Sequence, residues 1–206
     1  MFWHGWQNTR AHTAWEFFFP SDLQIPPNQQ LFQAGLSMGG MVAQQFSKLY
    51  PNRTKALIAM DCGPNETLLP WMQYYLATPL DTLIANDNNA SFTAILNTSN
   101  KTLPRQEIYN ELSLAGDAEI VKAMKACAEV VVDDPSYVRL NIPELLIYGA
   151  LDSLTNVSMI EWYNRDIANA HISLVSIPDA GHVSTLDNPQ AVTGALGQFL
   201  STFNSN

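Results

Sequence analysis

The stretch LFQAGLSMGGMVAQQFSKLYP, residues 31–51, places an apolar run before a glycine-flanked serine and a segment with helical periodicity. Residues 35–39 read GLSMG, so Ser37 lies between Gly35 and Gly39. A sharp turn from strand to helix strains its central residue and needs small neighbours, because the two backbones approach closely. The stretch therefore predicts a strand, a tight turn and a helix, with the Ser37 hydroxyl exposed above the strand. The alternative is a glycine-rich turn in which the serine is only a small structural residue.

Three further short apolar runs are typical of strands. Each is bounded by turn residues and lacks strict alternation, as expected for strands buried on both faces of a parallel sheet. Together with the first run they occupy residues 31–37, 55–61, 144–150 and 172–178. Because helical patterns alternate with these runs, we expect an α/β fold, a parallel sheet flanked by helices, in a single domain over 1–206.

Two helices are well marked by their spacing. The first follows Ser37, is stopped by Pro51, and should bury Val42, Phe46, Leu49 and Tyr50. The last should begin with Asn188 as N-cap and Pro189 at the first helical position. Its expected buried stripe is Val192, Leu196, Phe199, Leu200 and Phe203.

The interval 63–140 is too long to be one crossover between two strands. It reads as amphipathic helices joined by polar linkers such as ANDNNAS and NTSNKT. We therefore predict a helical lid, inserted in the domain and lying over one end of the sheet. Trp71, Tyr74 and Tyr75 are candidates to line an apolar substrate pocket, and packing of the lid against the sheet is the alternative role for each.

A nucleophilic serine requires a base and, behind the base, a carboxylate. Among the four histidines, His182 lies between the last predicted strand and the final helix, in a loop that can reach Ser37. Asp152 follows the strand at 144–150 and a glycine, which places it at the same edge of the sheet. Asp61 ends another strand at that edge and stays open as a competitor for the acid.

These motifs resemble the α/β-hydrolase family. The resemblance rests on GLSMGGMVAQQFSKLYPNRTKALIAMD, IPELLIYGALD and IPDAGHVSTLDNPQAV, in the family's order of serine, acid and histidine, and covers most of 31–61 and 140–203. It implies Ser37 as nucleophile, His182 as base and Asp152 as acid, in a hydrolase that cleaves carboxylic esters through an acyl-enzyme without metal or organic cofactor. Lactones, thioesters and carbon–carbon bonds are cleaved by the same triad in relatives.

The resemblance also implies an oxyanion hole made of two backbone N–H groups. One belongs to Met38, and the other to Trp6, which follows the pair His4 and Gly5. This pair comes closer to Ser37 than is usual in the family, so N-terminal strands on one side of the sheet are expected to be missing. We expect either a homodimer that covers this side or reduced stability. Two rival interpretations remain: a non-catalytic α/β-hydrolase-like binding protein, and a truncated inactive form.

The composition limits the partners. The chain has 206 residues, is 47% hydrophobic and carries a formal net charge of -9, without a basic cluster. Neither nucleic acid nor a membrane is therefore expected as a partner, and the small-molecule ester is the partner that the resemblance implies. No run approaches about 18 consecutive apolar residues, and the beginning does not resemble a signal peptide, which predicts a cytoplasmic protein. The secreted alternative rests on six NxS/T sequons, at Asn52, Asn65, Asn89, Asn97, Asn100 and Asn156.

Overall fold

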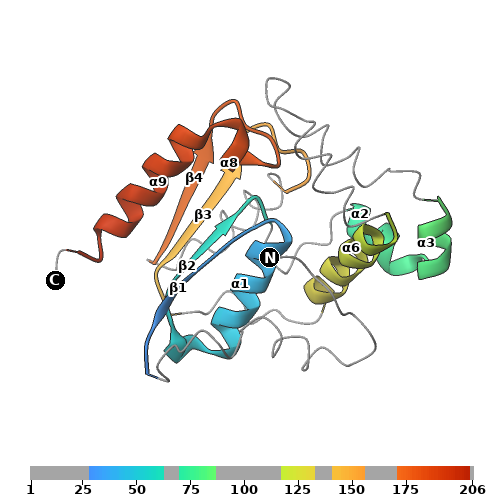
Figure 1. Ribbon diagram of the computed structural model, residues 1–206, viewed down its shortest axis with the longest axis horizontal. Coiled ribbons are helices and arrows are strands. Elements are labelled where there is room, and N and C mark those ends of the chain that lie inside the picture. The colour runs from blue at the N-terminus through green and yellow to red at the C-terminus, as the bar shows by residue number, and fades with distance from the viewer. Residues whose placement is uncertain (1–27, 63–69, 87–116, 133–140, 156–170, 205–206) are drawn as a thin grey trace.

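The computed structural model describes residues 28–62, 70–86, 117–132, 141–155 and 171–204 (Figure 1). Within these ranges one sheet is formed by β1 (Leu31–Leu36), β2 (Thr54–Met60), β3 (Glu144–Gly149) and β4 (Ile172–Ile177). The strands lie in the order β1-β2-β3-β4, and every neighbouring pair is parallel. The predicted α/β fold and its four strands are therefore confirmed, and the carboxyl ends of all four strands meet at one edge.

Seven helical segments accompany this sheet in the described residues. They are α1 (Met38–Leu49), η2 (Pro51–Arg53), α2 (Pro70–Ala77), α3 (Leu80–Asn86), α6 (Asp117–Val132), α8 (Ser184–Asp187) and α9 (Pro189–Ser201). The Asn188 side chain accepts a hydrogen bond from the Ala191 N–H at 3.2 Å, and Pro189 opens α9. The predicted beginning of the last helix is confirmed. No helix of the described residues is long and apolar enough to cross a membrane.

The two faces of the sheet bury two separate cores. Side chains alternate along a strand, so Leu57 and Ala59 of β2 point to one face while Ala56 and Ile58 point to the other. The first face packs against α1, through Met41 among others. The second face is covered by α9, whose Val192 and Phe199 join Ala56 and Ile58. The sheet therefore lies between two layers of helices.

The buried faces of the helices differ from the predicted stripes. In α1 the buried residues are Gly40, Met41, Ala43, Gln44, Phe46 and Ser47, and of the predicted stripe only Phe46 is among them. Leu49 and Tyr50 are 40% and 47% exposed. Small residues face the sheet because the helix lies very close to it: a Cβ on Gly40 would stand 2.4 Å from the Cys62 sulfur. In α9, Val192 and Phe199 are buried and Leu196 and Phe203 pack against the same core, as predicted, whereas Leu200 is 36% exposed.

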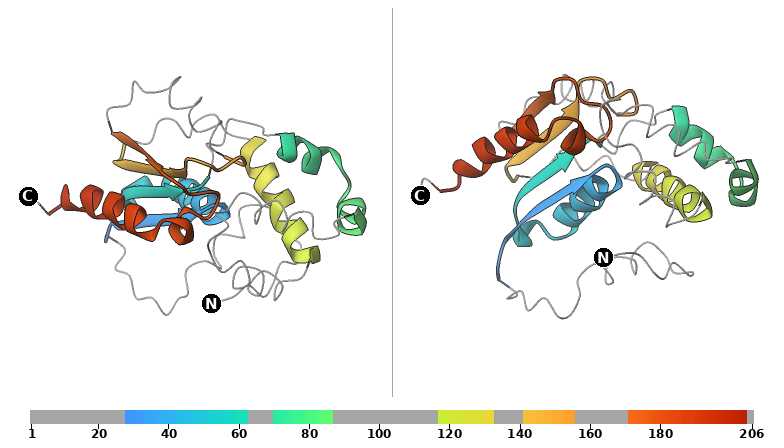
Figure 2. Two further views of the ribbon diagram at one scale, coloured as in Figure 1. Left: turned by 90° about the horizontal axis from the view of Figure 1, so that it is seen from above. Right: turned by 45° about the horizontal axis from the view of Figure 1, so that its top comes forward.

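Helices α2, α3 and α6 form a group at the end toward which the strands point, away from α9 (Figure 2). They share a core with the sheet, since Met72, Leu83 and Val121 belong to the same cluster as Leu57. Lys125 of α6 also donates hydrogen bonds to the carbonyls of Tyr75 and Thr78, which satisfies the end of α2. The described parts of 63–140 are thus helical, while the movement and role of a lid stay predictions.

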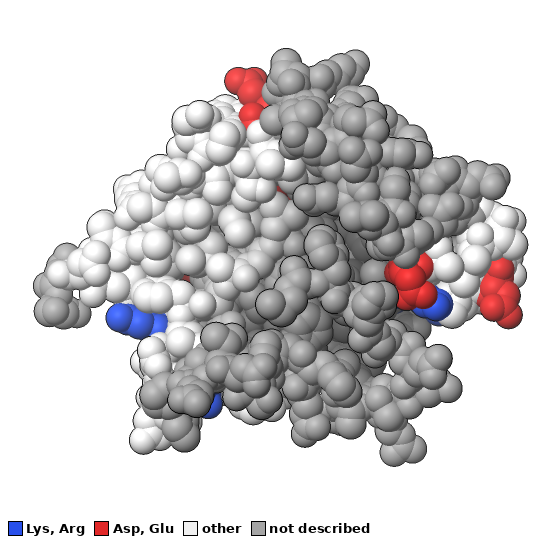
Figure 3. Space-filling view, viewed as in Figure 1, with Lys and Arg blue, Asp and Glu red and all other residues white. Residues whose placement is uncertain are grey.

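Among the residues that Figure 3 colours, the charged side chains that can be seen lie mostly toward the margins of this face. At the sheet's described edge, the Phe32 ring on β1 meets Phe203 edge to face at 5.1 Å, and Lys55 lies over both rings. Residues 1–27 lie outside the described ranges, so the predicted oxyanion-hole donor Trp6, after the His4–Gly5 pair, and the expected homodimer on this side are not tested.

A buried acid at the other end of the sheet should make stability depend on pH. Glu144 begins β3, is 2% exposed, and its Oε2 has no hydrogen-bond partner among the described residues. Burial raises the pKa of Glu144 to about 8. The unfolded chain ionises this group above about 4.5, whereas the folded protein keeps it neutral. This contribution to stability is therefore complete below that value and lost as the pH rises to about 8, by up to about 1.4 kcal/mol per pH unit.

The substitution Glu144→Gln removes the ionisation and keeps the shape. We expect the variant to gain stability over the wild type at pH 8 and to differ from it little at pH 4.5. Urea denaturation at both pH values measures this difference. Parallel stability curves for the two proteins across this range would contradict the assignment.

Candidate active site

The turn at Ser37 has the strained geometry that the sequence predicts. Ser37 connects β1 to α1 with a positive φ of 52°, and its N–H donates to the Met60 carbonyl at 2.8 Å. A Cβ on Gly35 would stand 2.0 Å from the Gly39 carbonyl oxygen, so no other residue fits at 35. Gly39 itself has open space around its Cβ position, and the second required glycine is Gly40. The tight approach is confirmed, but one of its glycines lies one residue later than predicted.

His182 is brought to Ser37 by the loop that follows β4. Its Nε2 lies 2.9 Å from the Ser37 Oγ, across 145 residues of sequence, and the side chain is 4% exposed. The loop is held against the end of β3, because a Cβ on Gly149 would stand 2.1 Å from the Gly181 carbonyl oxygen. Asp187 of α8 further accepts the Gly181 N–H at 2.7 Å. The loop that carries His182 is thus held at Gly181, by β3 and by Asp187.

Asp152 completes the chain of hydrogen bonds. Its Oδ2 lies 3.0 Å from His182 Nδ1 and also accepts the Thr155 hydroxyl, while Oδ1 accepts the Leu154 and Thr155 N–H groups at 2.8 and 3.3 Å. Burial opposes its ionisation, but the hydrogen bond and charge of His182, with the bonds from Thr155 and Leu154, hold the pKa of Asp152 below its usual value. Asp152 is therefore an anion that can only accept hydrogen bonds.

The charge of Asp152 decides the tautomer of His182. A carboxylate accepts, so Nδ1 carries the proton that it receives, and in the neutral form of the ring Nε2 is left as an acceptor. The Ser37 hydroxyl then donates to Nε2. This arrangement can remove the serine proton and stabilise the resulting imidazolium, which is the chemistry of a nucleophilic serine.

Asp61, the competing acid, has other partners. It is fully buried at the end of β2 and hydrogen-bonds to Gly149 and Ser184. In the described residues the hydrogen-bonded carboxylate of His182 belongs to Asp152. The structure thus brings together Ser37, His182 and Asp152, and their catalytic roles remain predictions.

The other predicted site residues are the oxyanion-hole and substrate-binding candidates, and the structure describes only some of their side chains. Met38 is the first residue of α1, where backbone N–H groups lack acceptors within the helix, whereas Trp6 lies outside the described residues. Trp71 belongs to α2, but its side chain is outside the description. Tyr75 is buried in the core cluster and Tyr74 is 51% exposed, although their rings touch edge to face at 5.7 Å. The two tyrosines therefore occupy different environments.

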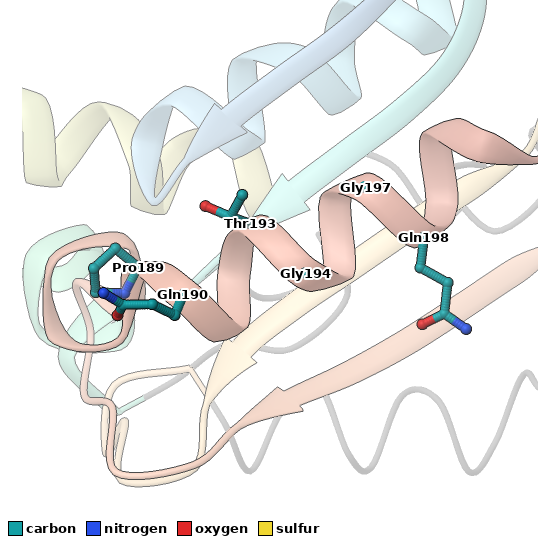
Figure 4. A pocket seen from close by; sticks show the side chains of 6 residues that line it. All are labelled: Pro189, Gln190, Thr193, Gly194, Gly197 and Gln198. Atoms are coloured by element: carbon teal, nitrogen blue, oxygen red, sulfur yellow. The ribbon is translucent and has the colours of Figure 1, made fainter.

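A surface hollow lies on α9 and does not include the serine, histidine or acid. It is lined by Pro189, Gln190, Thr193, Gly194, Gly197 and Gln198. Figure 4 shows that all six stand on this one helix. The described residues also contain no group of three or more His, Cys, Asp or Glu side chains placed to hold a metal ion. The chemistry of the described residues is therefore concentrated at the end of the strands.

Two curated proteins are similar to this chain. The sequence is 23% identical over 183 residues to a pimeloyl-[acyl-carrier protein] methyl ester esterase of Wigglesworthia glossinidia brevipalpis, which covers 82% of this chain and 70% of the relative. It is 26% identical over 187 residues to 3-oxoadipate enol-lactonase 2 of Acinetobacter baylyi, covering 88% and 67%. No model of a known protein family matches the sequence.

Solved structures of other proteins have an architecture similar to that of this chain. A hydrolase from Pseudomonas aeruginosa superposes with a TM-score of 0.64 at 26% identity, over 84% of this chain and 65% of that one. An alpha/beta hydrolase enzyme from a deep-sea metagenome library of the Medee basin gives 0.63 at 20% identity, over 85% and 66%. The chain thus spans about two thirds of the length of these structures.

Proposed function

Because the chain has the α/β-hydrolase fold, we propose that it is a serine hydrolase that cleaves carboxylic esters through an acyl-enzyme. The observation that carries the proposal is the continuous hydrogen-bonded path from Ser37 Oγ through both ring nitrogens of His182 to Asp152. The path begins at the strained turn between β1 and α1, a type of turn that exposes a serine hydroxyl at the end of the strands. The two curated relatives, an esterase and an enol-lactonase, support hydrolysis as the reaction class.

In this mechanism His182 Nε2 takes the Ser37 proton while Oγ attacks the ester carbonyl carbon. The carbonyl oxygen becomes an oxyanion, and the backbone N–H groups of Met38 and Trp6 are proposed to stabilise it. The imidazolium, paired with Asp152, then gives its proton to the departing alkoxide, so the C–O bond breaks and the alcohol leaves. Water, deprotonated by the same imidazole, then attacks the acyl carbon. The bond from this carbon to Ser37 Oγ breaks, the imidazolium returns the proton to Oγ, and the carboxylic acid leaves.

The substrate we propose is a small ester with an uncharged, apolar acyl group. The 63–140 segment would select it, with Trp71, Tyr74 and Tyr75 as contact residues. A lactone is the second candidate, because one of the two similar curated proteins is an enol-lactonase. A lactone differs from an open ester only in that its leaving alcohol stays attached to the acyl group. Thioesters and carbon–carbon bonds remain alternatives on the same three residues.

Two other proposals concern the setting of the protein. We infer a cytoplasmic location, with secretion as the alternative that the six sequons support.

The rivals to catalysis are a non-catalytic binding protein and a truncated inactive form. The binding protein predicts ligand binding without turnover.

The test is covalent labelling of the purified protein with a fluorophosphonate, followed by mass spectrometry of the modified peptide. It is run beside p-nitrophenolate release from acetate, butyrate and octanoate esters and ring opening of a simple lactone. Modification of the peptide that contains Ser37, together with turnover of at least one substrate, is the expected result. A folded protein that is neither labelled nor active would overturn the proposal in favour of the binding protein.

A further inference from the structure

Asp61 is a buried carboxylate that the proposed reaction does not use. It follows β2 with a positive φ of 48° and is 0% exposed. Its own N–H donates to the Ile147 carbonyl of β3 at 2.8 Å, so the backbone at this point is anchored to the neighbouring strand. The preceding residue, Met60, contacts the turn at Ser37, since its carbonyl accepts the Ser37 N–H. Asp61 therefore stands at the junction of three strands.

The carboxylate joins the two loops that carry the acid and the base. Its Oδ1 accepts the Gly149 N–H at 3.0 Å, three residues before Asp152. Its Oδ2 accepts the N–H and the hydroxyl of Ser184 at 2.9 and 2.6 Å, two residues after His182. One side chain thus connects both loops across 88 and 123 residues of sequence.

We propose that Asp61 is a positioning residue that holds the His182 loop against the Asp152 loop and so sets the distances from His182 to Ser37 and to Asp152. The inference rests on the proposed function for its effect on rate. It goes beyond that function because it assigns a role to a carboxylate whose hydrogen bonds go to Gly149 and Ser184 and to none of the three side chains of the proposed reaction.

The hydrogen-bond donors around Asp61 match a charged carboxylate. Three donors face its two oxygens, and an ionised carboxylate offers acceptors alone. Burial raises the pKa of Asp61 to about 6, against the lowering effect of the Ser184 bonds and the His182 charge, while the Asp152 charge adds to the rise. At pH 8 the group is charged. An asparagine in its place would turn an N–H toward one of the two backbone N–H groups, so one of the two loops would lose its anchor.

The test compares Asp61→Asn with the wild type at pH 8, using p-nitrophenyl ester turnover and the far-downfield proton resonance of the His182 Nδ1–H, assigned by its absence in His182→Ala. We expect kcat to fall about 10- to 100-fold with KM changed less than about twofold, because a small misplacement of a catalytic group costs rate rather than binding. The Nδ1–H resonance should shift or disappear. In the His182→Ala background the same substitution should cause no further loss of rate, because it acts through His182.

Glu144→Gln is the matched control. It also replaces a buried carboxyl of the sheet by an amide, but at the beginning of β3 rather than at the carboxyl end of a strand, so kcat and the His182 resonance should both stay unchanged. Should Asp61→Asn fail to fold, Ser184→Ala removes only the hydroxyl donor and should give a smaller loss, about 3- to 10-fold, with the same effect on the resonance.

The outcomes separate the two proposals. A folded Asp61→Asn protein with the wild-type resonance and kcat, or an equal further loss in the His182→Ala background, overturns the positioning role. Absence of turnover in the wild type overturns the proposed function, and the resonance of Asp61→Asn then still decides whether Asp61 positions His182.

Discussion

Replacing the serine, Ser37→Ala, should reduce kcat for the best ester substrate by at least about 10⁴-fold and abolish fluorophosphonate labelling. The variant keeps the turn, since alanine is smaller than serine, and it leaves His182 without the hydroxyl 2.9 Å from its Nε2. With no hydroxyl at position 37 the acyl-enzyme cannot form, and the residual rate comes from direct attack of water on the bound ester. Steady-state kinetics with p-nitrophenyl butyrate measures the loss, and circular dichroism shows that the variant is folded.

Ser47→Ala is the matched control for this experiment. Ser47 lies on α1, the helix that follows Ser37, is fully buried, and donates its hydroxyl to the Ala43 carbonyl at 2.8 Å. Its removal should leave kcat within about twofold of the wild type. Equal activity of Ser37→Ala and wild type would mean that the nucleophile is another group.

The acid should be the next largest contributor. Asp152→Asn should reduce kcat about 10⁴-fold while the fold persists, because an asparagine amide can donate to Nδ1 and then stabilises the tautomer that has its proton on Nε2. That tautomer cannot accept the Ser37 proton. The loss is measured as kcat at pH 8, where the wild-type carboxylate is ionised: its hydrogen bonds and the charge of His182 hold the pKa of Asp152 below its usual value.

Two comparisons make this prediction decisive. Asp179→Asn, in the exposed loop before His182, should leave kcat nearly unchanged, since asparagine tolerates the positive φ of 57° at this position. Asp61→Asn should lose much less activity than Asp152→Asn. The reverse order of the two losses would assign the role of acid to Asp61.

Much of the fold could be predicted from the sequence because the patterns that specify its strands and helices are local. Four apolar runs predicted the four strands to within about one residue at each end, and Asn188 with Pro189 marked the beginning of α9. Ser37 was identified by its glycines and by its place between a strand and a helix. The face that α1 buries was predicted wrongly: the sequence favoured large apolar residues, but contact with Cys62 demands small ones, and Gln44 is buried beside them.

Which of the neighbouring aromatic candidates is buried could not be predicted from the local pattern. Tyr74 and Tyr75 are neighbours in an aromatic run and both were candidates, yet one is exposed and the other is packed in the core. Adjacent positions on a helix point about 100° apart, and only the packing of α2 on α6 decides which of them is covered. The same holds for Lys125, whose charge is used to satisfy the end of α2.

The sequence by itself determined the succession of strands and helices along the chain, the strained turn at Ser37, and the two aspartates that reach the carboxyl edge of the sheet, because each depends on residues close together in the chain. Only the tertiary structure decided what those aspartates do. Asp61 and Asp152 both follow parallel strands, so both reach the same edge, and neither sequence position indicates which one faces His182. Pairing of β3 with β4 brings Asp152 to the imidazole, whereas β2, one strand further away, leaves Asp61 to bind the loops beneath it.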